Sequence, residues 1–216
     1  VHRATKRGER LFLQAPTGIG KTMSSLYPAV RACGEGLADR VFYLTAKAST
    51  RREAFGAVRR LVQNGAPLRA VVLTAREQIC PHPTAMIDGR ALSSHCNGVE
   101  CEYAQGYYDR AGDAIYELLT SGRGYDRRRL LEVAEKYKVC PYELSLDVSE
   151  YCDVIIADYN YAFDPMVYLR RYFAPGAACE GKNLFLIDEA HNLGDRACAM
   201  YSADLESDGL RPLFQA

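Results

Sequence analysis

Eight residues near the start of the chain, between a short apolar run and an amphipathic pattern, place the strongest constraint on its fold. Residues 11–15 predict a strand, and apolar side chains recur with helical spacing from Lys21 onward. The loop between them has the sequence Ala15, Pro16, Thr17, Gly18, Ile19, Gly20, Lys21, Thr22. In a strand–loop–helix of this kind the backbone N–H groups surround phosphate oxygens, the lysine reaches the β- and γ-phosphates, and the threonine hydroxyl ligates Mg²⁺. The segment therefore predicts a phosphate-binding loop, in which Ala15 replaces the first glycine of the strict pattern.

A second motif follows the apolar run at residues 184–187. It consists of Asp188, Glu189, Ala190 and His191. A carboxylate at the carboxyl end of a parallel strand projects into the crevice where nucleotides bind. We expect Asp188 to hold Mg²⁺, Glu189 to orient and polarise the attacking water, and His191 to couple the nucleotide state to neighbouring elements. Together with the phosphate loop, this motif predicts hydrolysis of a nucleoside triphosphate.

The remaining apolar runs predict an α/β fold with a parallel sheet. Strands are expected at residues 41–44, 70–74, 154–157 and 184–187, with helices at residues 54–62 and 163–172. The chain has 27 basic and 27 acidic residues, which excludes a histone-like polybasic protein. No apolar run is long enough to span a bilayer and no export signal is visible, so a cytoplasmic location is expected.

The α/β rhythm breaks at Cys80 and resumes after about residue 142. This interval carries helical patterns at residues 111–119 and 130–137, and no continuous strand is expected in it. We interpret it as an insertion with its own small core. The predicted organisation is residues 1–79 and 143–199 for one motor-like domain, residues 80–142 for the insertion, and residues 200–216 for the start of a further domain.

Eight cysteines in a chain expected to be in a reducing compartment need an explanation other than disulfides. Cys80, Cys96, Cys101 and Cys140 lie in polar, turn-rich surroundings within the insertion. Four such thiolates suit an iron–sulfur cluster or a zinc ion, and unrelated thiols are the third alternative. The two-residue spacing common in zinc sites is absent. His82 and His95 are nearby and are interpreted as neighbours rather than ligands.

These features occur in an order that resembles the XPD/DinG family of superfamily 2 DNA helicases. The resemblance rests on the phosphate loop, the strand at 41–45 with Lys47, the four cysteines, residues 140–142 and 157–161, and the acidic tetrad, and it covers nearly the whole chain. It implies a RecA-like P-loop parallel sheet with helices on both faces, interrupted by a small, mainly helical Fe-S insertion. The cofactors implied are ATP, Mg²⁺ and a [4Fe-4S] cluster held by Cys80, Cys96, Cys101 and Cys140.

The resemblance also implies 5′-to-3′ unwinding of single-stranded and forked DNA. Thr45 and Lys47, with Tyr159 and Asn160, match motifs near the DNA strand, and the residues after His191 resemble the start of the Arch domain. The second RecA-like domain of that family has no counterpart in this sequence. We therefore expect a fragment that binds nucleotide, hydrolyses it very slowly and does not unwind DNA.

Positive charge supports a nucleic-acid partner. It gathers in two segments, which contain Arg51, Arg52, Arg59, Arg60 and Arg76, and Arg123, Arg127, Arg128 and Arg129. Two alternatives remain open at this stage. One is a nucleotide-switched, nucleic-acid-binding module whose cysteines hold zinc. The other is a fragment of a DEAH-type RNA helicase with a coincidental cysteine insertion.

Overall fold

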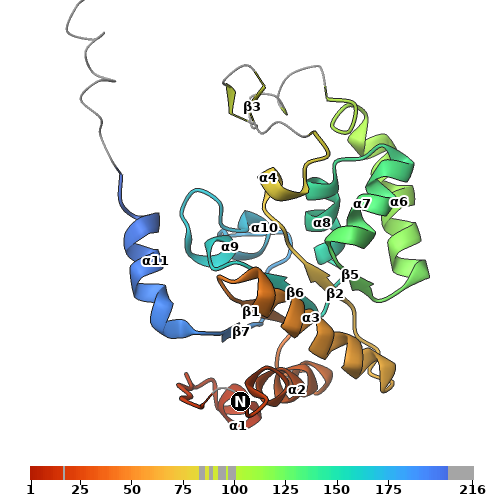
Figure 1. Ribbon diagram of the computed structural model, residues 1–216. Helices are drawn as coiled ribbons and strands as arrows, with labels where there is room; N and C mark the ends of the chain where they lie inside the picture. Colours follow the sequence, from red (N-terminus) through yellow and green to blue (C-terminus); the bar gives the residue numbers. More distant parts are fainter. Residues whose placement is uncertain (17, 83–85, 88–89, 92–95, 97–100, 204–216) are drawn as a thin grey trace, which may run out of the picture.

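A five-stranded parallel sheet forms the centre of the molecule (Figure 1). The computed structural model describes residues 1–16, 18–82, 86–87, 90–91, 96 and 101–203. The strand order is β5-β2-β6-β1-β7, and every neighbouring pair is parallel. The bounds are β1 (Arg40–Leu44), β2 (Ala70–Val72), β5 (Gly124–Tyr125), β6 (Val154–Ala157) and β7 (Asn183–Ile187). The predicted α/β class is confirmed.

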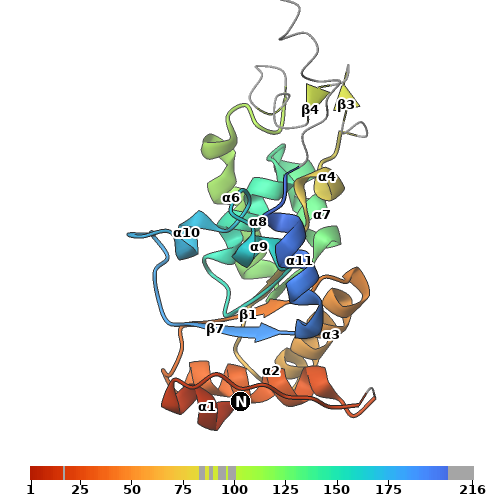
Figure 2. The ribbon, with the colours of Figure 1, turned by 90° about the vertical axis from the view of Figure 1, so that its left-hand side faces the viewer.

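Helices cover both faces of this sheet (Figure 2). Successive side chains of each buried strand point to opposite faces, so the strand packs against helices on both sides. In β1, Val41 and Tyr43 pack with α2 (Lys21–Gly34) and α3 (Ala48–Gln63). Phe42 and Leu44 point to the opposite face. That face is covered by α6 (Tyr107–Ser121), α7 (Arg127–Tyr137) and α8 (Pro141–Ser149). None of the described helices combines the length and the apolar character that crossing a bilayer requires.

The expected strand at residues 11–15 is wrong. After α1 (His2–Arg7), residues 9–16 form neither a helix nor a strand, and β7 is the last strand of the sheet on that side. The side chain of Phe12 is 89% exposed. An apolar run becomes a strand only where a neighbouring strand accepts its backbone hydrogen bonds, and this segment makes no such ladder. Its side chains line a cavity beside β7 instead.

The described helices between Cys80 and residue 142 share the core of the sheet and do not form a separate one. Leu118 of α6 and Leu130 of α7 belong to the same buried cluster as Phe42 and Ile155 of the sheet. The two-residue strand β5, between α6 and α7, pairs with β2 and so extends the main sheet. The expectations of a separate core and of no sheet strand are therefore wrong, because the helices bury their apolar faces on the sheet. The boundaries at residues 80 and 142 stay a prediction.

Three short elements lie directly before this interval or within its first part. The single-turn helix α4 (Arg76–Ile79) ends directly before Cys80, and β3 (Met86–Ile87) pairs with β4 (Arg90–Ala91) as an antiparallel hairpin.

The segment after β6 contains two single-turn helices rather than the one helix expected at residues 163–172. These are α9 (Asn160–Phe163) and α10 (Arg170–Phe173). Asp164 between them adopts an extended backbone, with φ −80° and ψ 121°, because the ring of Pro165 disfavours the helical conformation in the preceding residue. The chain then passes through β7, the 3₁₀ turn η1 (Ala190–Asn192) and α11 (Leu193–Met200). Most of the predicted further domain, residues 204–216, lies outside the described residues.

Candidate active site

The phosphate loop leads directly into α2. Gly18 and Gly20 have φ values of 85° and 81°, in the left-handed region that side chains rarely adopt, so glycine is needed at both positions to turn the chain. Lys21 is the first residue of α2 and Gly20 is its N-cap. The predicted loop residue Thr17 lies outside the described residues. The loop therefore ends at a helix N-terminus, where unpaired backbone N–H groups favour an anion.

Lys21 faces the acidic tetrad. Its Nζ lies 3.3 Å from Oε1 of Glu189, and each side chain is about one-third exposed. The other carboxylate oxygen of Glu189, Oε2, lies 3.4 Å from Nδ1 of His191. Glu189 itself has φ 52° and ψ 44°, a left-handed conformation that is costly for a residue other than glycine. The strained turn directs this carboxylate toward the lysine.

Thr22 and Asp188, the two predicted magnesium ligands, meet at a third residue. The hydroxyl of Tyr43 interacts with both of their side chains. Tyr43 is almost fully buried, and its burial, followed by the charge of Asp188, raises its pKa. The pKa of Asp188 is itself raised, chiefly by burial and then by Glu189, while Lys21 opposes this shift. Both predicted ligands therefore have Tyr43 as a common neighbour, and carboxylate and hydroxyl oxygens are of the kind that Mg²⁺ prefers.

Two backbone features hold this arrangement. The amide of Asp188 donates to the carbonyl of Leu44, which ties the end of β7 to the end of β1. The hydroxyl of Tyr159 donates to the carbonyls of Asp188 and Glu189. Tyr43 and Glu53 also contact the site residues, and the sequence alone did not indicate either of them. The carboxylate of Glu53 accepts a hydrogen bond of 3.1 Å from the Thr22 hydroxyl.

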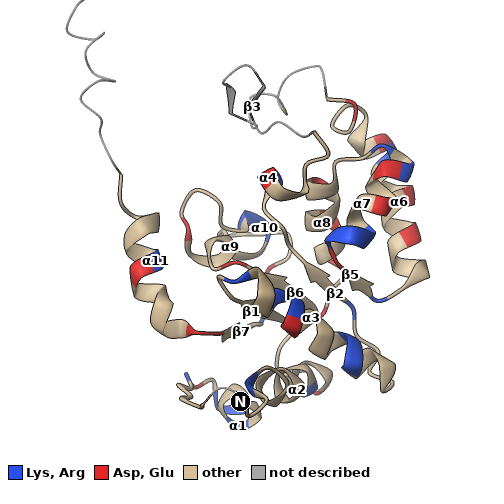
Figure 3. Cartoon of the chain, in the orientation of Figure 1, with Lys and Arg blue, Asp and Glu red and all other residues tan. Residues whose placement is uncertain are grey.

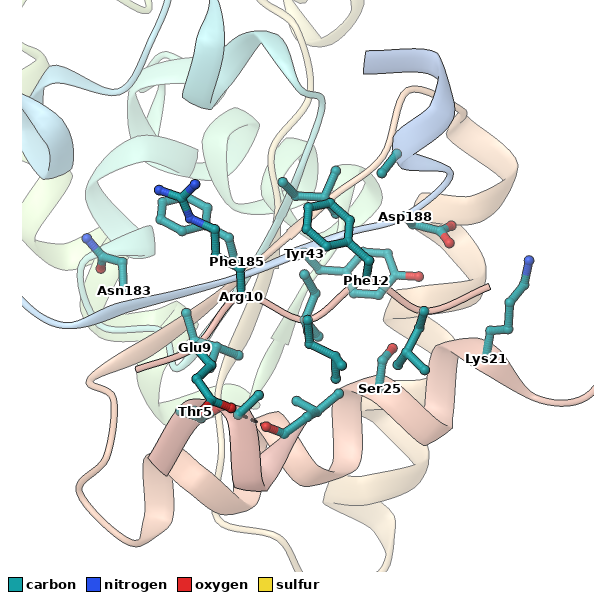
Figure 4. A pocket seen from close by; sticks show the side chains of 18 of the residues that line it. Thr5, Glu9, Arg10, Phe12, Lys21, Ser25, Tyr43, Asn183, Phe185 and Asp188 are labelled. Carbon is teal, nitrogen blue, oxygen red and sulfur yellow. Dashed lines mark hydrogen bonds between the residues drawn. The ribbon is translucent and has the colours of Figure 1, made fainter. Parts of the chain in front are cut away.

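A cavity of about 1630 Å³ opens beside these residues (Figure 4). It lies between α2, residues 9–15 and β7. Lys21 and Asp188 are at one end of it, and Asn183 is at the other. Its volume exceeds the 300–1000 Å³ that is typical of a small-molecule site. The side chains predicted to bind phosphate and magnesium, Lys21 and Asp188, therefore lie at one end of a space large enough for a nucleotide.

The residues matched to DNA motifs differ in accessibility. The side chains of Thr45 and Tyr159 are buried, so neither is available for direct contact with DNA in this structure. Lys47 is exposed at the start of α3. The side-chain oxygen of Asn160 accepts a hydrogen bond of 2.9 Å from Arg196.

An ion-pair network that the sequence did not indicate lies next to Asn160. Asp158 lies 3.3 Å from Arg51 and 2.9 Å from Arg196. It follows the buried strand β6, just as Asp188 follows β7, so the same signal could have identified it.

Among the four predicted cluster cysteines, Cys96 interacts electrostatically with each of the other three. Burial and the nearby thiols of Cys101 and Cys80 raise the pKa of Cys96, while Arg76 opposes this shift. Burial also raises the pKa of Cys140, with a smaller contribution from Cys96. Sγ of Cys101 lies 3.6 Å from Nε2 of His82. His95 lies outside the described residues.

Four thiols in one neighbourhood fit the donor chemistry of a cluster. No set of three or more His, Cys, Asp or Glu side chains is arranged to hold a metal ion, however, in the part of the chain that the structure describes.

Comparison with known proteins finds a matching family and relatives that are helicases. Residues 43–210 match the family DEAD_2. The chain is 31% identical over 135 residues to the regulator of telomere elongation helicase 1 homolog of Culex quinquefasciatus, covering 61% of this chain and 13% of the relative. It is 25% identical over 230 residues to the general transcription and DNA repair factor IIH helicase subunit XPD of Schizosaccharomyces pombe, covering 93% of this chain and 28% of the relative. The chain thus spans less than a third of the length of either relative.

Solved structures show the same fold. A structure described as truncated XPD superposes with a TM-score of 0.63 at 19% identity and covers 99% of this chain and 57% of that one. An XPD helicase structure superposes with a TM-score of 0.62 at 21% identity. That match covers 93% of this chain and 32% of the solved one.

Proposed function

The chain belongs to the DEAD_2 family, and from this premise we propose that it is the nucleotide-binding motor domain of an ATP-dependent DNA helicase. The observation that carries the proposal is the meeting of Lys21 and Thr22, at the start of α2, with Asp188 and Glu189, at the end of β7. Residues more than 160 positions apart in the sequence converge beside one cavity, and their chemistry matches that of a phosphoryl-transfer site.

Each residue has a distinct role in this proposal. Lys21 binds the terminal phosphates once Glu189 releases its ammonium group. Thr22 and Asp188 would hold Mg²⁺, which when bound supplies positive charge that neutralises the phosphates. Glu189 positions the attacking water and accepts a hydrogen bond from it. His191, within reach of Glu189, relays the state of that carboxylate toward α11.

The side chains of Cys80, Cys96, Cys101 and Cys140 would hold a [4Fe-4S] cluster. Support comes from the charges of Cys101 and Cys80, which raise the pKa of Cys96, and from the charge of Cys96, which raises the pKa of Cys140. Anaerobically purified protein is expected to be brown, with about four irons per chain. Cys140→Ser should lose the colour and the iron, whereas Cys198→Ser, which alters an exposed thiol, should keep both. A colourless protein with one zinc per chain would support the zinc-binding alternative instead.

The proposed partner is DNA, unwound in the 5′-to-3′ direction together with a second RecA-like domain and an Arch domain. Lys47 and Asn160 are the candidates for contact with the strand. An arginine supplied by another domain contributes about 10³–10⁵ in rate to related phosphoryl transfers. We therefore propose that this chain alone binds ATP, hydrolyses it very slowly and does not unwind DNA.

Steady-state ATP hydrolysis tests the proposed function. A longer protein that contains this chain should hydrolyse ATP faster with single-stranded DNA than with RNA, and Glu189→Gln should abolish that stimulated activity. Stimulation by RNA alone would favour the RNA helicase alternative. DNA-dependent unwinding by the 216-residue chain itself would contradict the proposal that it is inactive alone.

A further inference from the structure

A second cavity, of about 440 Å³, lies between α3 and the first turn of α7. Five arginines line it: Arg51, Arg52 and Arg59 from α3, and Arg127 and Arg128 from α7. Figure 3 shows basic positions on both helices, α3 and α7. We call this cavity the arginine groove. It shares no lining residue with the cavity beside Lys21, so the two sites are physically separate.

The spacing of the α3 arginines sets the length of the groove. Arg52 and Arg59 are seven residues apart and so project from the same face of the helix, about 10 Å from each other along its axis. Phe55 lies between them and is almost fully buried, so it forms part of the floor. The groove is therefore an elongated basic surface rather than a single-ion pocket.

The arginines of the groove differ in how far they are already neutralised. Arg127 donates to the backbone carbonyl of Gln78 at 2.9 and 3.0 Å, which joins α7 to the α4 segment without cancelling charge. Arg51 is paired with Asp158. Arg52 and Arg59 have no ion-pair partner among the described residues, and both are exposed.

The other two charged residues that line the groove, Arg128 and Asp126, change its net charge little. Arg128 lies 3.7 Å from Glu132, but its side chain is 86% exposed, so water screens this pair strongly. Asp126 is the acidic residue in the lining, and its carboxylate accepts the backbone N–H of Arg129 at the N-terminus of α7. The groove therefore keeps a net positive charge.

We propose that the arginine groove binds the phosphate backbone of single-stranded DNA. The inference rests on the proposed helicase function and adds a location for the strand on this domain. Arginines spaced along one helix and faced by a second helix suit a row of phosphates, and such contacts bind independently of base sequence. The groove begins beside Ala48, one residue after Lys47, so a strand that lies in it also passes the predicted DNA contact.

Salt-dependent DNA binding tests this inference in the full 216-residue chain. Fluorescence anisotropy with labelled oligothymidylate gives the affinity over a series of salt concentrations. The double variant Arg52→Gln/Arg59→Gln should bind about tenfold more weakly, and the slope of log K against log salt should fall by about 1.4, because each phosphate contact on a single strand contributes about 0.7.

Arg60→Gln is the matched control, since Arg60 is exposed on the same helix, adjacent to Arg59, and does not line the groove. It should leave both the affinity and the slope unchanged. Unchanged binding by the double variant, equal losses in variant and control, or a preference of the unmodified chain for duplex DNA would each overturn the groove assignment.

Binding of a fluorescent ATP analogue, measured on the same samples, separates this inference from the proposed function. The double variant should bind the analogue as the unmodified chain does, which also shows that it is folded. A chain that binds the analogue but no DNA contradicts the groove alone. A chain that binds DNA through the groove but no ATP analogue contradicts the proposed motor function and leaves the groove intact.

Discussion

The ammonium group of Lys21 lies 3.3 Å from Oε1 of Glu189, so the phosphate loop and the acidic tetrad are joined by an ion pair across the candidate site. An incoming phosphate must replace Glu189 as the partner of the Lys21 ammonium group. The Glu189 carboxylate must then interact with a water molecule instead. The pair thus opposes binding of the group that the site is proposed to hold.

Glu189→Gln should consequently bind ATP more tightly while losing hydrolysis. Ion pairs that solvent reaches contribute about 0–1 kcal/mol, so removing this one should tighten binding by up to about fivefold. Titration with a fluorescent ATP analogue measures the affinity, and phosphate release measures the rate. Glu180→Gln, at an exposed position outside the cavity lining, serves as the control and should change neither quantity. Weaker binding by Glu189→Gln would contradict a competing ion pair.

The shared core predicts that the helices after Cys80 unfold together with the sheet. Leu118 of α6 is fully buried in the cluster that contains Phe42 and Ile155. Leu118→Ala should lower the free energy of unfolding by about 2–5 kcal/mol and retain a single thermal transition. Tyr116→Ala, on the same helix but at a side chain that is 70% exposed, should have little effect. Two separated transitions in calorimetry would indicate an independently folded insertion.

Cysteine reactivity should separate the half-buried thiol of Cys33 from the exposed thiol of Cys198. Burial, followed by the charges of Asp153 and Asp39, raises the pKa of Cys33 to about 11. Since the thiolate is the reactive form, alkylation of Cys33 should be slow at neutral pH and rise about tenfold per pH unit up to that value. Cys198 is exposed and should react first. Timed iodoacetamide labelling with peptide mass spectrometry measures both sites, and equal rates at pH 7 would contradict this ordering.

Much of the sheet could be predicted from sequence because its buried strands read as apolar runs. β1 and β6 lie where residues 41–44 and 154–157 were expected. β5 could not be predicted, since Gly124 and Tyr125 form no recognisable run and pair with β2 only through tertiary packing. The helix α8 was missed because it is buried on several sides, including at Ser145 and Ser149, and so lacks an amphipathic pattern.

The candidate site was predictable to a similar degree. The resemblance to XPD-type helicases is confirmed by the family match and the relatives, and the phosphate loop and tetrad do converge. Contacts between distant residues were not predictable. Tyr159 was matched to a DNA motif, yet the fold buries it and directs its hydroxyl to the backbone of Asp188 and Glu189. A sequence motif identifies a residue, but the folded structure determines which groups that residue can contact.

Thr22 and Asp188 should make nucleotide binding dependent on magnesium. Asp188→Asn removes the charge that would face the ion, so added Mg²⁺ should no longer strengthen binding of the ATP analogue, although binding without Mg²⁺ should persist. Asp164→Asn, in the loop after α9, should retain the full response to Mg²⁺. A titration with and without chelator measures the difference, and an undiminished magnesium effect in Asp188→Asn would exclude this ligand.

Equilibrium binding of Mg-ATP to the unmodified chain and to Lys21→Ala tests the nucleotide site most directly. Loss of a charge-assisted contact of about 1.5–3 kcal/mol should weaken binding about 10- to 100-fold. Lys182→Ala removes a lysine that lines the far part of the same cavity and should leave the affinity unchanged. Saturable binding that depends on Lys21 and not on Lys182 is the predicted result. Equal affinity in all three proteins, or no binding by the unmodified chain, would contradict an ATP site at this loop.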